Sequence, residues 1–263
     1  MDNLTETINC ELHDSFAVVT IRGKDENNAL DSSAVRELTR VFSELKSNLV
    51  ARSVILAGAD DHAFSTGVDI EEISTLMPEQ ARVFARAGQS LTSLIENLGK
   101  PVIAAMNGLA FGAGCDLALA CTWRIADSSA KFAYPEVSYG VLPEFGGASR
   151  LPRLIGKSRA LEMILTGDQI GADEALRIGL VNRVARSRDE LMAVCEELAI
   201  SIGHNAPLAI RYALEAVNHA TEVSIDDGLR LESSLFGLCF ATEDVREGTS
   251  AFLEKRPPVF RGK

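Results

Sequence analysis

The sequence is poor in the residues that form disulfides and metal sites. Its 263 residues include five cysteines, which are odd in number, scattered, and form no Cys-x-x-Cys pair. This pattern favours free thiols in a reducing, cytoplasmic compartment over a disulfide framework. The four histidines have no metal-binding spacing, so the sequence predicts no metal site.

Positive charge is also scarce. The chain has 26 Lys and Arg against 37 Asp and Glu, which gives a formal net charge of −11 at pH 7. Nucleic acids and anionic membrane surfaces attract proteins with a basic face, so we expect neither as a partner. A small phosphorylated ligand stays compatible with this charge, because a few local Lys or Arg side chains can bind it.

No hydrophobic segment is a convincing membrane span. The best candidate, residues 101–123, has the necessary length and a single charged side chain, that of Asp116. Its three glycines, Asn107 and the absence of flanking basic clusters argue against insertion. We expect a buried strand, turn and helix there, and the polar start of the chain shows no signal-peptide pattern.

The sequence instead alternates strands and helices, as α/β proteins with parallel sheets do. β-rich runs occupy residues 16–21, 53–58, 101–108, 123–127 and 131–134. Helical spacing is found at residues 31–45, 78–98, 115–123, 159–167, 172–179 and 188–202, and in a strand-free tail from 207 to 255. Asp31, Ser32 and Pro78 suit helix starts.

Three acids, Asp116, Glu136 and Glu144, lie in apolar, glycine-rich sequence. Each has a simple structural explanation: Asp116 as a helix cap, Glu136 as a first-turn helix residue, and Glu144 as a turn residue. The presence of three such acids in one chain favours a role in proton transfer. Desolvation raises the pKa of a carboxyl group and suits it to proton transfer near neutral pH.

Two glycine-containing turns follow predicted strands, at residues 63–70 and 108–114. Small residues at such turns allow backbone N–H groups to converge on one oxygen, which is how an oxyanion hole is built. The second turn lacks the third glycine of a dinucleotide-binding fingerprint, so a nicotinamide cofactor is not favoured.

An ordered set of segments resembles the enoyl-CoA hydratase/isomerase, or crotonase, family over nearly the whole chain. These segments are NNAL (27–30), AFSTGVDI (63–70), residues 100–127 around GLAFGAGCDLALA, residues 132–156 around YPEVSYGVLPEFGG, residues 160–184, and EGTSAFLEKRPPVF (247–260). The resemblance is specific to the superfamily and much less so to one reaction.

The resemblance implies an α/β fold with a ββα spiral core, here residues 1–200, and a helical C-terminal region, residues 201–263, that makes oligomer contacts in a homotrimer or dimer of trimers. It implies an acyl-CoA thioester substrate and no cofactor, since coenzyme A is part of the substrate. The N–H groups of Val68 and Ala113 would stabilise the thioester enolate. Ala113 stands where the family usually has glycine, which leaves the hole intact if its φ is negative.

The family pattern also implies roles for the three acids. As in a hydratase, Glu136 would be the main acid/base and Asp116 would orient and activate water, although hydratases usually have Glu at the first position. Dienoyl-CoA isomerases resemble this chain in having Asp first, Glu second and an acid eight residues later, as Glu144 is here.

The remaining residues carried over by the resemblance belong to substrate and CoA binding. They are Asn28, Ala29, Thr66, Gly67, Val68, Asp69, Ile70, Gly112, Ala113, Phe252 and Lys255. Glu71 replaces a lysine often found near the CoA adenine, so Arg22, Lys24, Lys255 and Arg256 are candidates for the CoA phosphates, the last two from a neighbouring subunit.

The resemblance therefore implies an enoyl-CoA hydratase. Two alternatives stay open: an acyl-CoA double-bond isomerase that uses Glu136 with Glu144 or Asp116, and a non-catalytic acyl-CoA-binding subunit. The retained acids argue against the second, because a protein that only binds has no need to desolvate carboxylates.

Overall fold

The computed structural model describes residues 7–23 and 26–263 and contains two sheets. The larger sheet has the order β1-β2-β3-β5-β7-β10, and only β1 runs antiparallel to its neighbour. Its strands are β1 (Ile8–Leu12), β2 (Phe16–Ile21), β3 (Ser53–Gly58), β5 (Val102–Met106), β7 (Trp123–Asp127) and β10 (Arg183–Ala185). The smaller sheet consists of β4 (Ala63–Ser65), β6 (Leu109–Phe111), β8 (Lys131–Ala133) and β9 (Ile170–Gly171).

Pairs of consecutive strands are shared between the sheets. β3, β5 and β7 each lie in the larger sheet, and the strand that follows each of them, β4, β6 or β8, lies in the smaller one. A helix then returns the chain for the next pair: α2 (Ile70–Ile73) with α3 (Pro78–Glu96), α4 (Ala113–Leu119), or α5 (Gly147–Ile155). This repetition confirms the predicted ββα spiral.

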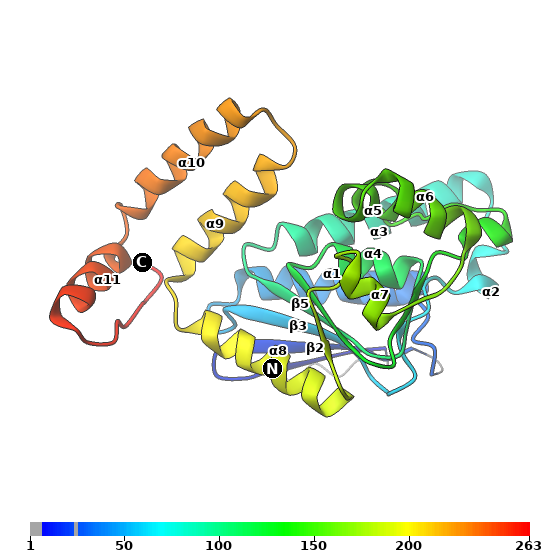
Figure 1. Ribbon diagram of the computed structural model, residues 1–263, viewed down its shortest axis with the longest axis horizontal. Coiled ribbons are helices and arrows are strands. Elements are labelled where there is room, and N and C mark those ends of the chain that lie inside the picture. Colours follow the sequence, from blue (N-terminus) through cyan, green and yellow to red (C-terminus); the bar gives the residue numbers. More distant parts are fainter. Residues whose placement is uncertain (1–6, 24–25) are drawn as a thin grey trace.

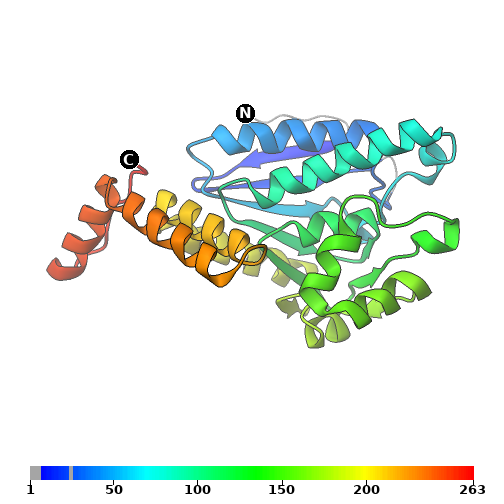
Figure 2. The same ribbon diagram turned by 90° about the horizontal axis from the view of Figure 1, so that it is seen from above.

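Both faces of the larger sheet are covered (Figures 1 and 2). In β3 the side chains of Val54 and Leu56 belong to the core beneath α1 (Ser32–Ser47) and α3, whereas Ile55 belongs to a second core with Cys195 and Ala199 of α8 (Arg188–Gly203). All six β3 residues are buried, as in a central parallel strand.

The helical C-terminal tail extends away from this body (Figures 1 and 2). It contains α9 (Pro207–Ala220), α10 (Ile225–Cys239) and α11 (Glu243–Glu254), and it lacks strands as predicted. The boundary predicted at residue 200 falls inside α8, which packs on the sheet. The side chain of Asn218 donates to Glu96 O at 3.0 Å and so ties the end of α9 to α3.

Several local predictions need correction. The helix predicted over residues 115–123 begins at Ala113 and ends at Leu119, because Thr122 exchanges hydrogen bonds with Val102 and draws the chain into the larger sheet. The short strands β1, β4, β6, β9 and β10 were not predicted, since two to five residues carry little periodicity.

The other connections are the 3₁₀ turn η1 (Glu136–Tyr139), α6 (Lys157–Thr166) and α7 (Ala172–Arg177). None of the helices within residues 7–23 and 26–263 combines the length and the apolar character that crossing a membrane requires.

Substitution of Gly88 tests how closely α3 packs against the Phe145 ring. A Cβ atom there would lie 2.0 Å from the Phe145 ring, so we expect Gly88→Ala to displace Phe145 and to destabilise the protein by about 1–3 kcal/mol. The matched control is Gly237→Ala in α10, where a Cβ meets nothing within 4 Å and should stabilise by up to about 1 kcal/mol. Urea unfolding compares the two, and equal stability of both variants would contradict the expectation.

Candidate active site

Two backbone N–H groups come together at the turns after β4 and β6. Leu30 donates its N–H to Gly67 O at 2.8 Å, and Asp69 donates to Leu30 O at 3.1 Å. The Val68 N–H lies between these bonds and has no acceptor among residues 7–23 and 26–263. Ala113 is the first residue of α4, so its N–H has no acceptor within the helix.

Gly67 brings these two segments into contact. A Cβ at Gly67 would lie 3.0 Å from Phe111 O and 3.4 Å from Ala113 N, and Gly67 has a φ of +99°. The positive φ therefore favours glycine there, and a Cβ would also crowd Phe111 O. The residue before α4, Gly112, has a positive φ of +47°. Among the described residues only two non-glycines, Asn28 and Lys255, have a positive φ. Ala113 thus meets the condition of a negative φ.

Glu136 lies beside this pair of N–H groups. It opens η1, is 5% exposed, and within the described part of the chain neither of its carboxyl oxygens has a hydrogen-bond partner. A Cβ at Gly112 would lie 2.3 Å from Glu136 Oε1, so the carboxyl group rests against the backbone immediately before Ala113. Its oxygens are available for proton transfer to a molecule bound at the N–H pair.

Asp116 is fully buried in α4 and does not cap the helix. Its Oδ1 accepts from the Tyr134 hydroxyl at 3.0 Å, its Oδ2 accepts from the Phe145 N–H at 3.0 Å, and the Gly147 N–H also donates to the carboxylate. A Cβ at Gly147 would lie 2.0 Å from Asp116 Oδ1, so only glycine permits this approach.

Glu144 lies on the turn that Asp116 holds. Its carbonyl oxygen accepts from Gln89 Nε2 at 2.9 Å, but its Oε1 is buried and has no partner among the described residues. Thr92 of α3 donates to Phe145 O at 2.8 Å. The backbone of the turn is therefore fixed, whereas the Glu144 carboxyl group is not.

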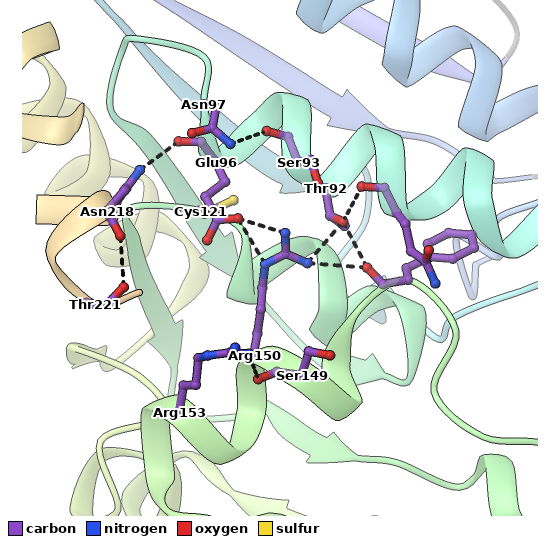
Figure 3. A network of polar contacts seen from close by, with 12 residues as sticks. Thr92, Ser93, Glu96, Asn97, Cys121, Ser149, Arg150, Arg153, Asn218 and Thr221 are labelled. Carbon is purple, nitrogen blue, oxygen red and sulfur yellow. Dashed lines mark hydrogen bonds and ion pairs between the residues drawn. The ribbon is translucent and has the colours of Figure 1, made fainter. Parts of the chain in front are cut away.

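Arg150 braces the same turn from α5 (Figure 3). Its guanidinium donates to Thr92 Oγ1 at 3.1 Å and forms an ion pair with Glu96 at 2.7 Å. A Cβ at Gly146 would lie 2.4 Å from Arg150 Nη1, which places the guanidinium against the turn. The hydrogen bonds of Arg150 and Thr92 thus link the turn to α3.

Burial shifts the pKa values of all three carboxyl groups upward. It raises the pKa of Asp116 to about 6, against the lowering effect of the Gly147, Tyr134 and Phe145 donors. Burial, and then the charge of Asp116, raises the pKa of Glu136 to about 7. Burial, then the charges of Asp116 and Glu136, raises the pKa of Glu144 to about 8. All three carboxyl groups therefore have pKa values raised towards neutral pH, where such a group is suited to proton transfer.

The remaining predicted binding residues of the first third lie around the Val68 turn. Asn28 is buried; its Oδ1 accepts from Gly23 N at 2.9 Å and its Nδ2 donates to Ala63 O at 2.7 Å. Its side chain therefore holds the backbone near β4. Thr66 donates its N–H to Asn27 O, Asp69 caps α2, and Ile70 is half exposed at the start of that helix.

The predicted CoA-binding residues near the C-terminus lie far from the acids within one chain. Phe252, which is 83% exposed, and Lys255 belong to α11 and its C-cap. α11 lies at the opposite end of the molecule from α2, and α4 lies within the main body (Figure 1). Arg256, which follows α11, forms an ion pair with Glu247 of that helix. Arg22 is exposed after β2, and Lys24 lies outside the described residues.

Sequence reasoning missed the residues that hold the site together. Four residues contact Asp116 or the turn that it binds: Tyr134, Phe145, Thr92 and Arg150. Their hydrogen-bond partners lie 18 or more positions away in the sequence, and no local pattern distinguishes such a residue from one that faces solvent. Residues 7–23 and 26–263 contain no group of three or more His, Cys, Asp or Glu arranged to hold a metal ion.

The raised pKa of Glu136 predicts a stability effect that depends on pH. Below about pH 4.5 the group is protonated whether folded or unfolded; as pH rises towards 7 the unfolded chain ionises first, so stability falls. Glu136→Gln should remove this loss and exceed the wild type at pH 8.5 by about 2–3 kcal/mol, with little difference at pH 4.5.

Urea unfolding at both pH values and at fixed protomer concentration measures this difference. Glu71→Gln, on the exposed surface of α2, is the control. A Glu136→Gln advantage of equal size at both pH values would contradict the assignment.

The chain matches known proteins along almost its full length. The family model described as enoyl-CoA hydratase/isomerase matches residues 11–263. The chain is 43% identical over 246 residues to a short-chain-enoyl-CoA hydratase of Clostridium acetobutylicum, covering 94% of both, and 42% identical to a crotonyl-CoA hydratase of Syntrophomonas wolfei, covering 98% of this chain and 99% of that protein. A crystal structure of enoyl-CoA hydratase from Bacillus anthracis superposes with a TM-score of 0.94 at 35% identity, covering 98% of this chain and 100% of that one. The chain belongs to the enoyl-CoA hydratase/isomerase family.

Proposed function

We propose that the protein is an enoyl-CoA hydratase that adds water to the double bond of a short α,β-unsaturated acyl-CoA thioester, or removes it. The observation that carries this proposal is the Glu136 carboxyl group, which is buried against Gly112, immediately before Ala113, and whose two oxygens have no hydrogen-bond partner among the described residues. The relatives named as short-chain and crotonyl-CoA hydratases support a short acyl chain.

The geometry suits the charge that develops during hydration. As the oxygen of water bonds to C3, the electrons of the C2–C3 double bond move to the thioester oxygen, where the Val68 and Ala113 N–H groups stabilise the enolate. Glu136 accepts the proton that the water loses, and a second carboxyl group protonates C2. Every proton is supplied by water or by a carboxyl group, so the reaction needs no cofactor.

Double-bond isomerisation is the second candidate function. It is favoured by Glu144, whose buried Oε1 has no partner within the described residues. In that reaction Glu136, with Glu144 or Asp116, removes a proton from one carbon of the enolate system and returns it to another, and no oxygen is added.

The other partners follow from the same proposal. Exposed apolar side chains on α10 and α11, such as Phe236 and Phe252, support a subunit interface in a homotrimer or dimer of trimers. Such an assembly would let Phe252, Lys255 and Arg256 of one subunit approach the CoA bound by its neighbour. The free cysteines support a cytoplasmic location, where the enzyme would serve fatty-acid β-oxidation.

Labelled water separates the candidate functions. Incubation of crotonyl-CoA in heavy-oxygen water should give a 3-hydroxyacyl-CoA product that carries the label at the hydroxyl group. Conversion of a dienoyl-CoA without uptake of label would establish the isomerase instead. Absence of turnover with every enoyl- and dienoyl-CoA tested would favour a binding subunit.

The contribution of the Ala113 N–H can be removed without removing the helix. Proline is accepted at the first position of a helix, so Ala113→Pro should keep α4 while deleting one donor of the oxyanion pair. We expect kcat to fall by about 10²–10³-fold.

Ala113→Gly, which keeps the N–H group, is the matched control and should stay within a few-fold of the wild type. Circular dichroism establishes that both variants fold. A folded proline variant with undiminished kcat would argue against the oxyanion role.

A further inference from the structure

The peptide unit between Gly67 and Val68 is held by the segment that precedes α1. Leu30 donates its N–H to Gly67 O at 2.8 Å, and this carbonyl belongs to the same peptide unit as the Val68 N–H. In a trans peptide the C=O and N–H bonds point in opposite directions. The bond from Leu30 therefore fixes the plane of the peptide and directs the Val68 N–H away from Leu30. On the far side of Val68, Asp69 donates its N–H to Leu30 O at 3.1 Å.

The helix that follows Val68 has little apolar anchoring. The four residues of α2, all within the described part of the chain, include no buried side chain, although Ile73 packs partly against the core. A single helical turn gains too little from its own hydrogen bonds to stay folded without tertiary contacts. Polar contacts are therefore needed to hold α2, and with it the end of the Val68 turn.

Glu72 of α2 makes such a contact with the start of α1. Ser32, the first residue of α1, donates its N–H to Glu72 Oε2 at 2.8 Å and its hydroxyl to Glu72 Oε1. The Ser32 N–H has no acceptor within α1, and the positive end of this 16-residue helix favours a carboxylate beside it. Glu72 is half-buried, whereas its neighbour Glu71 is exposed.

We propose that Glu72 is a positioning residue for the oxyanion hole. Its paired hydrogen bonds with Ser32, the Ser32–Glu72 clamp, keep residues 30–32 against the turn that presents the Val68 N–H. The carboxylate does not touch the substrate, because both of its oxygens are engaged by Ser32. This inference rests on the enolate-stabilising role of Val68 in the proposed function.

The clamp is needed because the contact nearest the oxyanion hole is small. Leu30 and Val68 form an isolated bridge and not a pair of strands, so two backbone hydrogen bonds alone join the segments there. The Ser32–Glu72 clamp adds a second attachment and restrains rotation about the first. A displacement of about 1 Å near reacting atoms can lower a rate by about 10²-fold.

The kinetic test is hydration of crotonyl-CoA by two Glu72 variants. Glu72→Ala removes both bonds of the clamp and should lower kcat by about 10–10²-fold, with KM within about threefold, since the loss concerns the transition state. Glu72→Gln keeps an acceptor for the Ser32 N–H and a donor for its hydroxyl, so it should stay within about fivefold of the wild type. Equal losses in the two variants would count against the inference.

Substitution of Ser32 tests the clamp from the other side. Ser32→Ala removes only the hydroxyl bond and should lower kcat by about three- to tenfold. The matched control is Ser43→Ala, which removes an exposed hydroxyl bonded to Thr39 O within the same helix and should leave kcat unchanged. If circular dichroism shows that Glu72→Ala does not fold, Ser32→Ala decides, and a kcat equal to that of Ser43→Ala overturns the inference.

Binding of an enolate distinguishes an oxyanion effect from a general loss of structure. Acetoacetyl-CoA ionises to an enolate that carries negative charge on its thioester oxygen, whereas butyryl-CoA is a saturated thioester without such charge. Hydrogen bonds to a charged acceptor are the stronger ones, so the wild type should bind acetoacetyl-CoA more tightly. Glu72→Ala should reduce this preference by about tenfold, measured as the ratio of the two Kd values by calorimetry.

The outcomes separate the inference from the proposed function. A wild type that adds no labelled oxygen to crotonyl-CoA overturns the hydratase function, while enolate binding still tests the clamp. A wild type without preference for the enolate overturns the oxyanion chemistry, and the inference with it. A wild type that hydrates and prefers the enolate, with Glu72→Ala within about threefold of it in both kcat and preference, overturns only the inference.

Discussion

The buried carboxylate of Asp116 joins three segments that are far apart in the sequence. It lies in α4 and accepts hydrogen bonds from Tyr134, after β8, and from the backbone of the turn that begins α5. Without this acceptor the N–H groups of Phe145 and Gly147 would be buried and unsatisfied, which typically costs 1–3 kcal/mol for each group. The location of Glu144, and so the composition of the candidate site, depends on that contact.

The site places three acids where burial opposes their ionisation. This becomes unfavourable for folding as pH rises above about 4.5, because Glu136 and Glu144 hold their protons more strongly in the folded protein than in the unfolded one. Two well-packed cores on the two faces of the larger sheet offset the loss. The same burial gives the acids pKa values near 7, where a group can both accept and donate a proton.

Close approach of backbone and side chain explains several glycines around the site. Gly112 lets the Glu136 carboxyl rest against the start of α4, Gly147 lets Asp116 reach the turn, and Gly88 accommodates the Phe145 ring. Each glycine is separated in sequence from the group it accommodates, by 24, 31 and 57 positions respectively. Residues that look like turn formers in the sequence therefore act as spacers between elements that meet only in the folded molecule.

Local sequence patterns were enough to predict the alternation of strands and helices, the buried character of the three acids and the two turns that present N–H groups. These features depend on local periodicity and on neighbouring residues, as in β3 and around Val68 and Ala113. Which of the three acids accepts hydrogen bonds from other elements became evident in the folded molecule, where this acid is Asp116. Asp116, Glu136 and Glu144 have similar apolar surroundings in the sequence, but their hydrogen-bond partners come from other elements. The tertiary structure also decided that Asn28 holds the backbone and that Phe252 and Lys255 lie far from the acids of their own chain. The physical reason is that hydrogen bonds and close contacts are set by the packing of distant segments, which no local pattern records.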